Sequence, residues 1–220
     1  MGRAGRIKIR WSSRFAYAIG LITTDGSLSK DGRHIAFVSK DKEMVDNFLK
    51  ALSVDVHVGK KGSGSTVGKR YFVVQLSDVN FYNFLCGIGL KCNKSKTIDG
   101  MKIPQKYFLD FLRGHFDGDG SFYSYYDKRW KSSLMFYLSF VSASKNHIVW
   151  LRREIESNLN VKGHITNSSV YQLKYAKKEA VVIIKNIYKK NCLCLSRKYN
   201  KILSVVNLKS PGGEIGKIGR

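Results

Sequence analysis

Two acidic residues, Asp25 and Asp119, stand at matching places in the two halves of this 220-residue chain, and each is followed directly by glycine. They lie 94 residues apart (119 − 25), and each ends an apolar run that carries one internal glycine, Gly20 or Gly114. A glycine inside a helix costs roughly 1 kcal/mol against alanine, so a packing reason is expected for it. The pattern predicts two helices that pack on each other through these glycines.

Helices packed in this way would end side by side and would bring Asp25 and Asp119 together at their C-terminal ends. The helix dipoles place negative partial charge there, and two carboxylates repel each other, so folding alone does not favour the pair. A divalent cation would reverse the local electrostatics, because Mg²⁺ prefers hard oxygen ligands. Alternatively, each acid only caps its own turn, as Asp-Gly pairs often do. Two copies at matching places favour the metal site.

The composition points to a polyanionic partner. The chain has 39 Lys and Arg residues against 16 Asp and Glu, a net charge of +23, while its hydrophobic content of 43% is ordinary. No apolar run approaches the ~20 residues that span a bilayer, so no membrane association is expected. Nucleic acid is the commonest partner of such a chain. The alternative is a basic protein whose lysines are only solvated.

The two glycine-acid segments resemble the nine-residue motif of the LAGLIDADG homing endonucleases. In the first half the motif residues that remain are Gly20, Leu21, Ile22, Asp25 and Gly26. In the second half they are Leu112, Gly114, Asp117, Asp119 and Gly120. Thr23 departs from the acid usual at its motif position, whereas Asp117 keeps it. The resemblance covers nearly the whole chain, roughly residues 12 to 206.

The pattern of helices, strands and turns also repeats, in the order α-β-β-α-β-β-α, and predicts an α+β fold. In the first half, the second hairpin is expected to pair a strand at Val54–Val58 with one at Tyr71–Leu76 across a loose loop at 60–68. The predicted parts are a basic N-terminal arm at 1–10, a first repeat at 11–92, a linker at 93–105, a second repeat at 106–206 and a flexible tail at 207–220.

Because strand side chains alternate between faces, aligning the repeats predicts which face of each sheet is buried. Apolar residues such as Phe37, Val74, Phe140 and Leu173 should cover the helices. The alternate residues should face outward, with basic loops beside them, and could reach base edges and phosphates. The expected DNA-binding residues are Ser27, Ser29, His34, Lys69, Tyr71, Val73, Gln75, Ser121, Tyr123, Tyr125, Lys128, Arg129, Lys131, Tyr137, Ser139, Gln172 and Lys174. An ordinary solvated sheet face is the alternative.

The resemblance implies a monomer that needs no protein partner, with two pseudo-symmetric repeats whose antiparallel sheets form a saddle over double-stranded DNA. It implies that the motif helices form the interface and that Asp25 and Asp119 are the essential acids and metal ligands. The carbonyls of Thr24 and Gly118 are further possible ligands. It implies Mg²⁺ or Mn²⁺ as the cofactor, Ca²⁺ supporting binding without cleavage, and hydrolysis of both strands that leaves short 3′ overhangs.

Family members also carry a basic residue near each active site, at the end of the last strand or the start of the next helix. In the second half Lys174, Lys177 and Lys178 are candidates for this role. In the first half the same region offers Gln75, Ser77 and Asp78 and no lysine, so the two sites are expected to be unequal in their catalytic groups. His115, inside the second motif helix, is expected to be a packed or rim histidine rather than a catalytic base.

Two other functions remain open at the level of sequence. One is an RNA-binding intron maturase that uses the same saddle, and the other is a DNA-binding regulator that does not cleave. Both acids are retained, which favours the enzyme. The four cysteines, Cys86, Cys92, Cys192 and Cys194, do not have the spacing of structural zinc sites. They are expected to be reduced, in an intracellular compartment such as the cytoplasm, the nucleoid or an organelle matrix.

Overall fold

The computed structural model describes residues 7–63, 66–127 and 133–206. The N-terminal half contains α1 (Ser13–Asp25), β1 (Gly26–Leu28), β2 (His34–Ser39), α2 (Lys42–Leu52), β3 (Gly59–Ser63), β4 (Thr66–Ser77) and α3 (Val79–Gly87). The C-terminal half contains α4 (Phe108–Asp119), β5 (Ser121–Tyr126), β6 (Leu134–Ser142), α5 (Lys145–Leu159), β7 (His164–Asn167), β8 (Tyr171–Ala176), α6 (Lys177–Ile187) and α7 (Ser196–Leu203). The predicted repeat order is confirmed, with α7 following the second copy. The predicted tail at 207–220 lies outside the described residues.

Each half forms one four-stranded antiparallel sheet, in the order β1-β2-β4-β3 or β5-β6-β8-β7. The registers match, because Phe37 pairs with Val74 in the first sheet and Phe140 pairs with Leu173 in the second. All four of these side chains are fully buried, while Gln75 on the alternate face of β4 is exposed. The two-sided sheets predicted from the alternation are therefore present.

One strand differs from the sequence prediction. The expected strand at Val54–Val58 does not form, and β3 lies instead at Gly59–Ser63, of which residues 60–63 belong to the predicted loop. Val54, Val56 and Val58 are partly buried and pack against the core as a connector. The strand forms in a segment of low β-propensity because the long strand β4 offers it a row of backbone partners, from Gly59 opposite Val73 onward.

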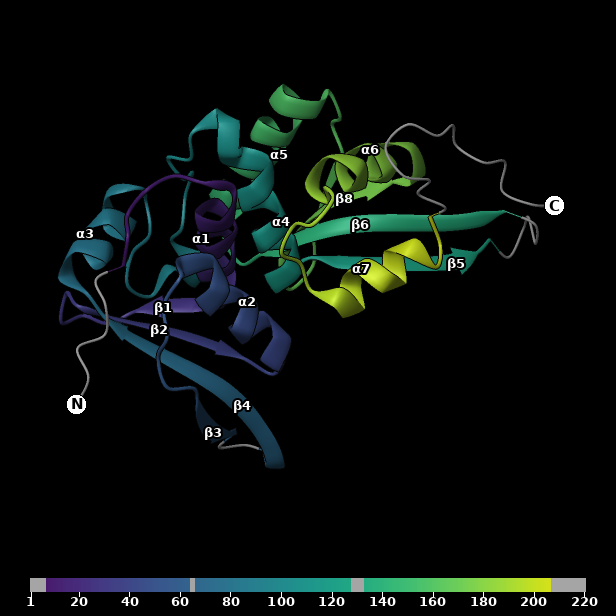
Figure 1. The fold of residues 1–220 in the computed structure, drawn as a ribbon. Coiled ribbons are helices and arrows are strands. Elements are labelled where there is room, and N and C mark those ends of the chain that lie inside the picture. Colours follow the sequence, from purple (N-terminus) through teal and green to yellow (C-terminus); the bar gives the residue numbers. More distant parts are fainter. Residues whose placement is uncertain (1–6, 64–65, 128–132, 207–220) are drawn as a thin grey trace.

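The two motif helices, α1 and α4, contact each other more extensively than any other pair of described elements. Figure 1 shows them together at the centre of the molecule, between the two sheets. A Cβ built on Gly20 would lie 2.2 Å from the carbonyl oxygen of Phe111, and one on Gly114 would lie 2.1 Å from that of Tyr17. These distances are far below van der Waals contact, so only glycine allows the backbones to approach this closely.

The segment that begins α7 also joins the two halves. Arg197 Nε donates to Asp41 at 2.7 Å, and the backbone N–H of Ser196 donates to Glu43 at 3.1 Å, so the start of α7 is bonded to the start of α2. Asn47 Nδ2, on α2, donates to the carbonyl of Cys194 at 2.8 Å. The halves are therefore connected at the motif helices and again through α7.

Gly114→Ala should lower the free energy of unfolding by about 2–4 kcal/mol, because the added methyl group meets rigid backbone that must move apart. Chemical denaturation monitored by circular dichroism measures this change. Gly87→Ala is the matched control, since a Cβ there meets no atom within 4 Å, and it should be neutral or slightly stabilising. Equal stability of the two variants would contradict close packing at Gly114.

Candidate active site

The ends of α1 and α4 meet, and the meeting point carries the two acids. A Cβ on Gly118 would lie 2.0 Å from Thr24 Oγ1 and 2.5 Å from Asp25 Oδ2, so the end of α4 is pressed against the end of α1. Asp119 follows Gly118 directly, and its charge is one of the causes that raise the pKa of Asp25. The structure thus brings together the two carboxylates that the sequence placed 94 residues apart.

Both acids hold their protons more tightly than free aspartate does. Burial is the main cause that raises the pKa of Asp25 to about 6, with a smaller contribution from Asp119. The Thr24 hydroxyl opposes this shift, since it donates a 2.8 Å hydrogen bond to Asp25 Oδ2. Burial likewise raises the pKa of Asp119, opposed by the charges of Lys198 and Lys94. The ionised pair is therefore held at an energetic cost, as expected of a site built for a cation.

Two lysines occupy equivalent positions at the ends of the motif helices. Lys94 Nζ donates to the carbonyls of Thr24, at 3.3 Å, and of Gly26. Lys198 Nζ, from α7, donates to the carbonyls of Phe116, Gly118 and Gly120 at 2.7, 3.1 and 2.6 Å. Carbonyls at a helix C-terminus lack intrahelical partners and attract cations, so each ammonium satisfies the end of one motif helix.

These lysines are partly removed from water. Burial lowers the pKa of Lys198 to about 8 and also lowers that of Lys94, while Asp25 and Asp119 partly oppose both shifts. One ammonium and one carboxylate therefore lie at the end of each motif helix.

The donor set at the paired acids fits a hard divalent cation. Asp25 and Asp119 supply carboxylate oxygens, and the carbonyls of Thr24 and Gly118 each accept one lysine proton while retaining a second lone pair. Within the described residues no group of three or more His, Cys, Asp or Glu side chains could hold a metal. An ion here would keep several water or substrate oxygens, as Mg²⁺ usually does.

The acid at the other motif position, Asp117, has a structural environment. It is completely buried and accepts hydrogen bonds from Tyr17 at 2.8 Å, Tyr188 at 3.1 Å and the backbone N–H of Leu195 at 2.8 Å. Because Tyr17 lies on α1, this carboxylate bonds the two motif helices to each other. Among the described residues, the hydroxyl of the equivalent Thr23 bonds only within its own helix, to the carbonyl of Ile19 at 2.7 Å.

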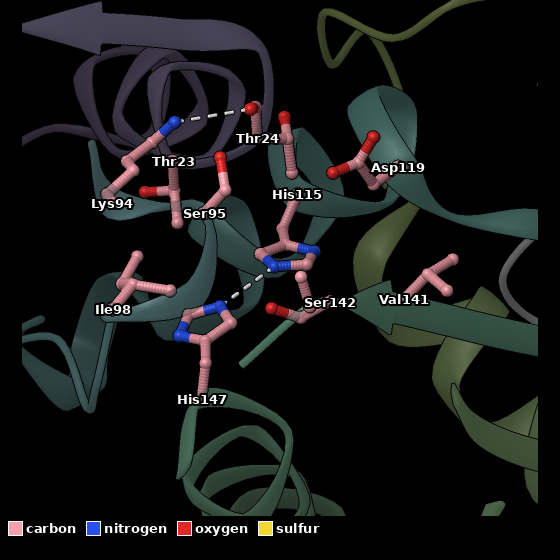
Figure 2. Close-up of a pocket in the computed structure, with 11 residues that line it drawn as sticks. Thr23, Thr24, Lys94, Ser95, Ile98, His115, Asp119, Val141, Ser142 and His147 are labelled. Atoms are coloured by element: carbon pink, nitrogen blue, oxygen red, sulfur yellow. Dashed lines mark hydrogen bonds between the residues drawn. The ribbon is translucent and has the colours of Figure 1, made fainter. Parts of the chain in front are cut away.

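A cavity of about 160 Å³ lies beside Asp119. Its walls include Thr23 and Thr24 from α1, Lys94 from the connection between the halves, and Ser142 at the end of β6. Figure 2 shows His115 and His147 at its base, with their rings joined by a hydrogen bond. The cavity therefore connects the candidate metal ligand Asp119 with two buried imidazoles.

The predicted DNA-binding residues for which side-chain burial is described lie on the strands or at their ends, and most are exposed or half-buried. On the second sheet Tyr137 stacks between Tyr123 and Tyr125, with ring centroids 5.3 and 6.2 Å apart. Ser139 is buried, and its hydroxyl lies 2.7 Å from that of Ser121. The exposed or half-buried members are Ser27, Ser29, His34, Tyr71, Val73, Gln75, Ser121, Tyr123, Tyr125, Tyr137, Gln172 and Lys174. Lys128, Arg129, Lys131 and the side chain of Lys69 lie outside the described part of the chain.

The basic residues that act on the acids are not those singled out in the sequence. Lys174 lies in β8 opposite Ser139, and Lys178 is exposed in the first turn of α6. The charges that shift the pKa of Asp119 belong to Lys198 and Lys94 instead. Lys94 follows a short connection after α3, and Lys198 follows one after α6. Aligning the two halves beyond these helices would therefore have paired the two lysines.

Neither a protein-family profile nor a curated protein matches this sequence. Solved structures match its fold. The homing endonuclease I-WcaI, solved bound to its DNA recognition sequence, aligns with a TM-score of 0.63 and 14% identity over 87% of this chain and 87% of its own. I-DmoI in complex with DNA and Mn aligns with a TM-score of 0.52 and 16% identity over 82% of this chain and 98% of its own.

The fold also occurs in a protein of another name. The N-terminal LAGLIDADG domain of DUF199/WhiA aligns with a TM-score of 0.54 and 18% identity over 89% of this chain and 91% of its own. Full-length DUF199/WhiA from Thermatoga maritima aligns with a TM-score of 0.56 and 17% identity over 96% of this chain. The alignment covers 66% of that protein's own length. The chain therefore has the LAGLIDADG fold. Among the residues described, no helix is both long and apolar enough to cross a membrane.

Asp25→Asn should stabilise the protein at neutral pH and not at acidic pH. The folded state binds the Asp25 proton more tightly than the unfolded state, with a pKa of about 6 against 3.8. Ionisation therefore lowers stability as the pH rises from 4 to 6, and the loss persists above that range. We expect the substitution to raise the free energy of unfolding by about 1–2 kcal/mol at pH 7.5, a value reduced from the full shift because the group reaches solvent.

Denaturation of both proteins at pH 4 and pH 7.5 without divalent ions tests this expectation. Asp55→Asn is the control, since Asp55 is exposed in the connector before β3 and should show no effect at either pH. A lower stability of Asp25→Asn at pH 7.5 would mean that the carboxylate is favourably paired in the fold.

Proposed function

We propose that this chain is a site-specific endonuclease that binds duplex DNA across the outer faces of its two sheets. It cleaves both strands by metal-dependent hydrolysis of phosphodiester bonds, as a monomer. The observation that carries the proposal is the pair Asp25 and Asp119, whose carboxylates are brought together although burial opposes the ionisation of each. A purely structural role gives no reason for this arrangement.

The residues of the chain supply a site for phosphate as well as for a cation. Asp25 and Asp119, with the carbonyls of Thr24 and Gly118, would hold Mg²⁺ or Mn²⁺. When bound, such ions activate water and stabilise the leaving 3′ oxygen in an in-line displacement. Lys94 and Lys198 fix the ends of the two motif helices and place a positive charge beside each acid. That charge favours the approach of a phosphodiester.

The outer faces of the sheets would supply binding and specificity. Their exposed side chains are mainly hydroxyl, amide, phenol and amine groups, which read base edges in a major groove and contact phosphates. With a net charge of +23, the chain has ample positive charge for a long duplex. The DNA and Mn of I-DmoI and the bound recognition sequence of I-WcaI are consistent with this use of the fold.

A DNA-binding regulator without cleavage is the second candidate, because the LAGLIDADG fold also occurs in DUF199/WhiA, whose name does not include endonuclease. Such a protein would bind DNA equally well with or without Mg²⁺ and would have no need for the repelling acids. An RNA-binding maturase is the third, and a preference for structured RNA over duplex DNA in competition binding would indicate it.

Duplexes selected from a randomised library in Ca²⁺ should be cut on both strands when Mg²⁺ replaces Ca²⁺, and EDTA should stop the reaction. Asp119→Asn should abolish double-strand cleavage while binding in Ca²⁺ survives, because the substitution removes one charged ligand and leaves the sheets unchanged. Gel analysis of end-labelled duplex measures both. Asp55→Asn is the charge-matched control and should cut normally. Full cleavage by Asp119→Asn would contradict the assignment of the metal ligands.

Binding in Ca²⁺ should weaken steeply with salt. If roughly 8 phosphates are neutralised, the logarithm of the binding constant should fall against the logarithm of the salt concentration with a slope near −7. Fluorescence anisotropy of the selected duplex at roughly 50 to 200 mM KCl gives this slope. A nearly flat response would contradict binding of DNA through the basic surface.

A further inference from the structure

The two buried histidines beside Asp119 form a directed chain of hydrogen bonds. His147 Nδ1 lies 2.8 Å from the backbone carbonyl of Asp99, which can only accept, so this nitrogen carries the proton. Burial lowers the pKa of both His115 and His147, which keeps the two rings neutral. His147 Nε2 then carries a lone pair and accepts a hydrogen bond from the Nε2–H of His115 across 3.0 Å.

The remaining nitrogen of His115 must therefore be an acceptor. His115 is 1% exposed, and within the described residues its Nδ1 has no hydrogen-bond partner. The ring lines the cavity that Asp119 also lines, and Figure 2 shows both residues projecting from the same helix toward that space. A buried nitrogen without a partner is costly, so the cavity should contain a donor for it.

Two residues that line the cavity thus carry acceptors, His115 at its unpartnered Nδ1 and Asp119 at its carboxylate. No hydrogen bond to the Asp119 carboxylate occurs among the described residues, although lysine charges act on it. A molecule that satisfies both must offer two donors and fit about 160 Å³ of polar space. Water meets these requirements.

In the N-terminal half the acid receives its hydrogen-bond donor in a different way. Its acid, Asp25, is oriented by the hydroxyl of Thr24 at 2.8 Å. The residue before Asp119 is Gly118, and a side chain there would overlap Thr24 Oγ1 at 2.0 Å, so the second half cannot use a threonine. The C-terminal acid therefore lacks the donor that its counterpart has.

The histidines are also specific to the C-terminal half. Leu21 stands four residues before Asp25, as His115 stands before Asp119, and Met44 stands five residues after Ser39, as His147 stands after Ser142. Leu21 and Met44 are both buried apolar side chains in the structure. One half of the chain thus fills these positions with packing groups, and the other fills them with a hydrogen-bonding relay.

We propose that His115 is a positioning residue of the Asp119 site, which holds a water molecule between its Nδ1 and the Asp119 carboxylate and so orients that acid as Thr24 orients Asp25. His147 and the Asp99 carbonyl fix the tautomer that makes this possible. If each acid serves one DNA strand, the role of His115 is confined to the strand that Asp119 serves. This inference rests on the proposed nuclease function.

The tautomers can be measured in the free protein without any cleavage assay. Long-range ¹H–¹⁵N spectra of the imidazoles at pH 7.5 should show His147 as the Nδ1–H form and His115 as the Nε2–H form, with His147→Met used to assign the signals. A protonated His115, or one that carries its proton on Nδ1, would overturn the proposal because no lone pair would then face the cavity.

Strand-resolved cleavage of the selected duplex tests the role in the site. His115→Leu with His147→Met installs the apolar pair of the N-terminal half. The double variant should lower the cleavage rate of the strand most affected by Asp119→Asn by about tenfold or more, a typical loss for one orienting hydrogen bond in an active site. The cleavage rate of the other strand should be nearly unchanged. His115→Asn, which keeps an acceptor at the δ position, should restore part of the rate.

Ile155→Val is the control for general loosening of the C-terminal core, since Ile155 is fully buried in α5, and it should slow neither strand selectively. Equal slowing of both strands by the double variant, or no slowing of either, would overturn the role of His115. If the unmodified protein cuts neither strand, the proposed nuclease function fails, and the role of His115 in it fails as well. A loss confined to the variants is distinguishable from that outcome.

Discussion

The backbone contact between α1 and α4 is the constraint on which the rest of the structure depends. The helices approach until the carbonyl of one faces the α-carbon of the other at Gly20 and Gly114, and any side chain there would collide with backbone. This approach brings the helix ends together and with them Asp25 and Asp119. The helix pair lies between the two sheets, so this contact, together with the bonds of the α7 segment to α2, holds the two sheets relative to each other.

The two halves share a plan but not its details. In the C-terminal half the first motif acid, Asp117, became a buried anchor that receives two tyrosine hydroxyls and a backbone N–H. In the N-terminal half Thr23 occupies that place, and its hydroxyl bonds to the carbonyl of Ile19 in its own helix. The donors near the second acid differ as well, a threonine hydroxyl in one half and a cavity with two histidines in the other. Two acids in equivalent positions therefore experience different surroundings, and the asymmetry is a property of the chain itself.

Much of the fold could be predicted from the sequence because it depends on local patterns that occur twice. The glycine-acid repeat predicts the helix pair, and the alternation around Phe37 and Phe140 predicts the buried sheet faces. The strand at Gly59–Ser63 could not be found in this way, since its residues have little β-propensity and the strand exists only through pairing with β4. The composition of a segment does not indicate that a distant strand will pair with it.

The site was predictable only in part, for a related reason. Carboxylates are visible as residue types, so Asp25 and Asp119 could be identified. Lys94 and Lys198 act on backbone carbonyls, which every residue possesses, and nothing in the sequence tells which carbonyls a lysine will reach. The contact of His115 with His147 likewise joins positions 32 residues apart whose proximity depends on the packing of α5 against α4.

The position of Lys198 in α7 has a consequence for the newly made protein. Asp25, Lys94 and Asp119 are all synthesised well before α7. Lys198 of α7 then bonds the carbonyls at the end of α4, and Ser196 and Arg197 bond to the start of α2. A nascent chain that stops after its second sheet would carry both carboxylates with only one of their two ammonium partners. The full set of carboxylates and ammonium groups at the two helix ends therefore forms only after α7 has been synthesised.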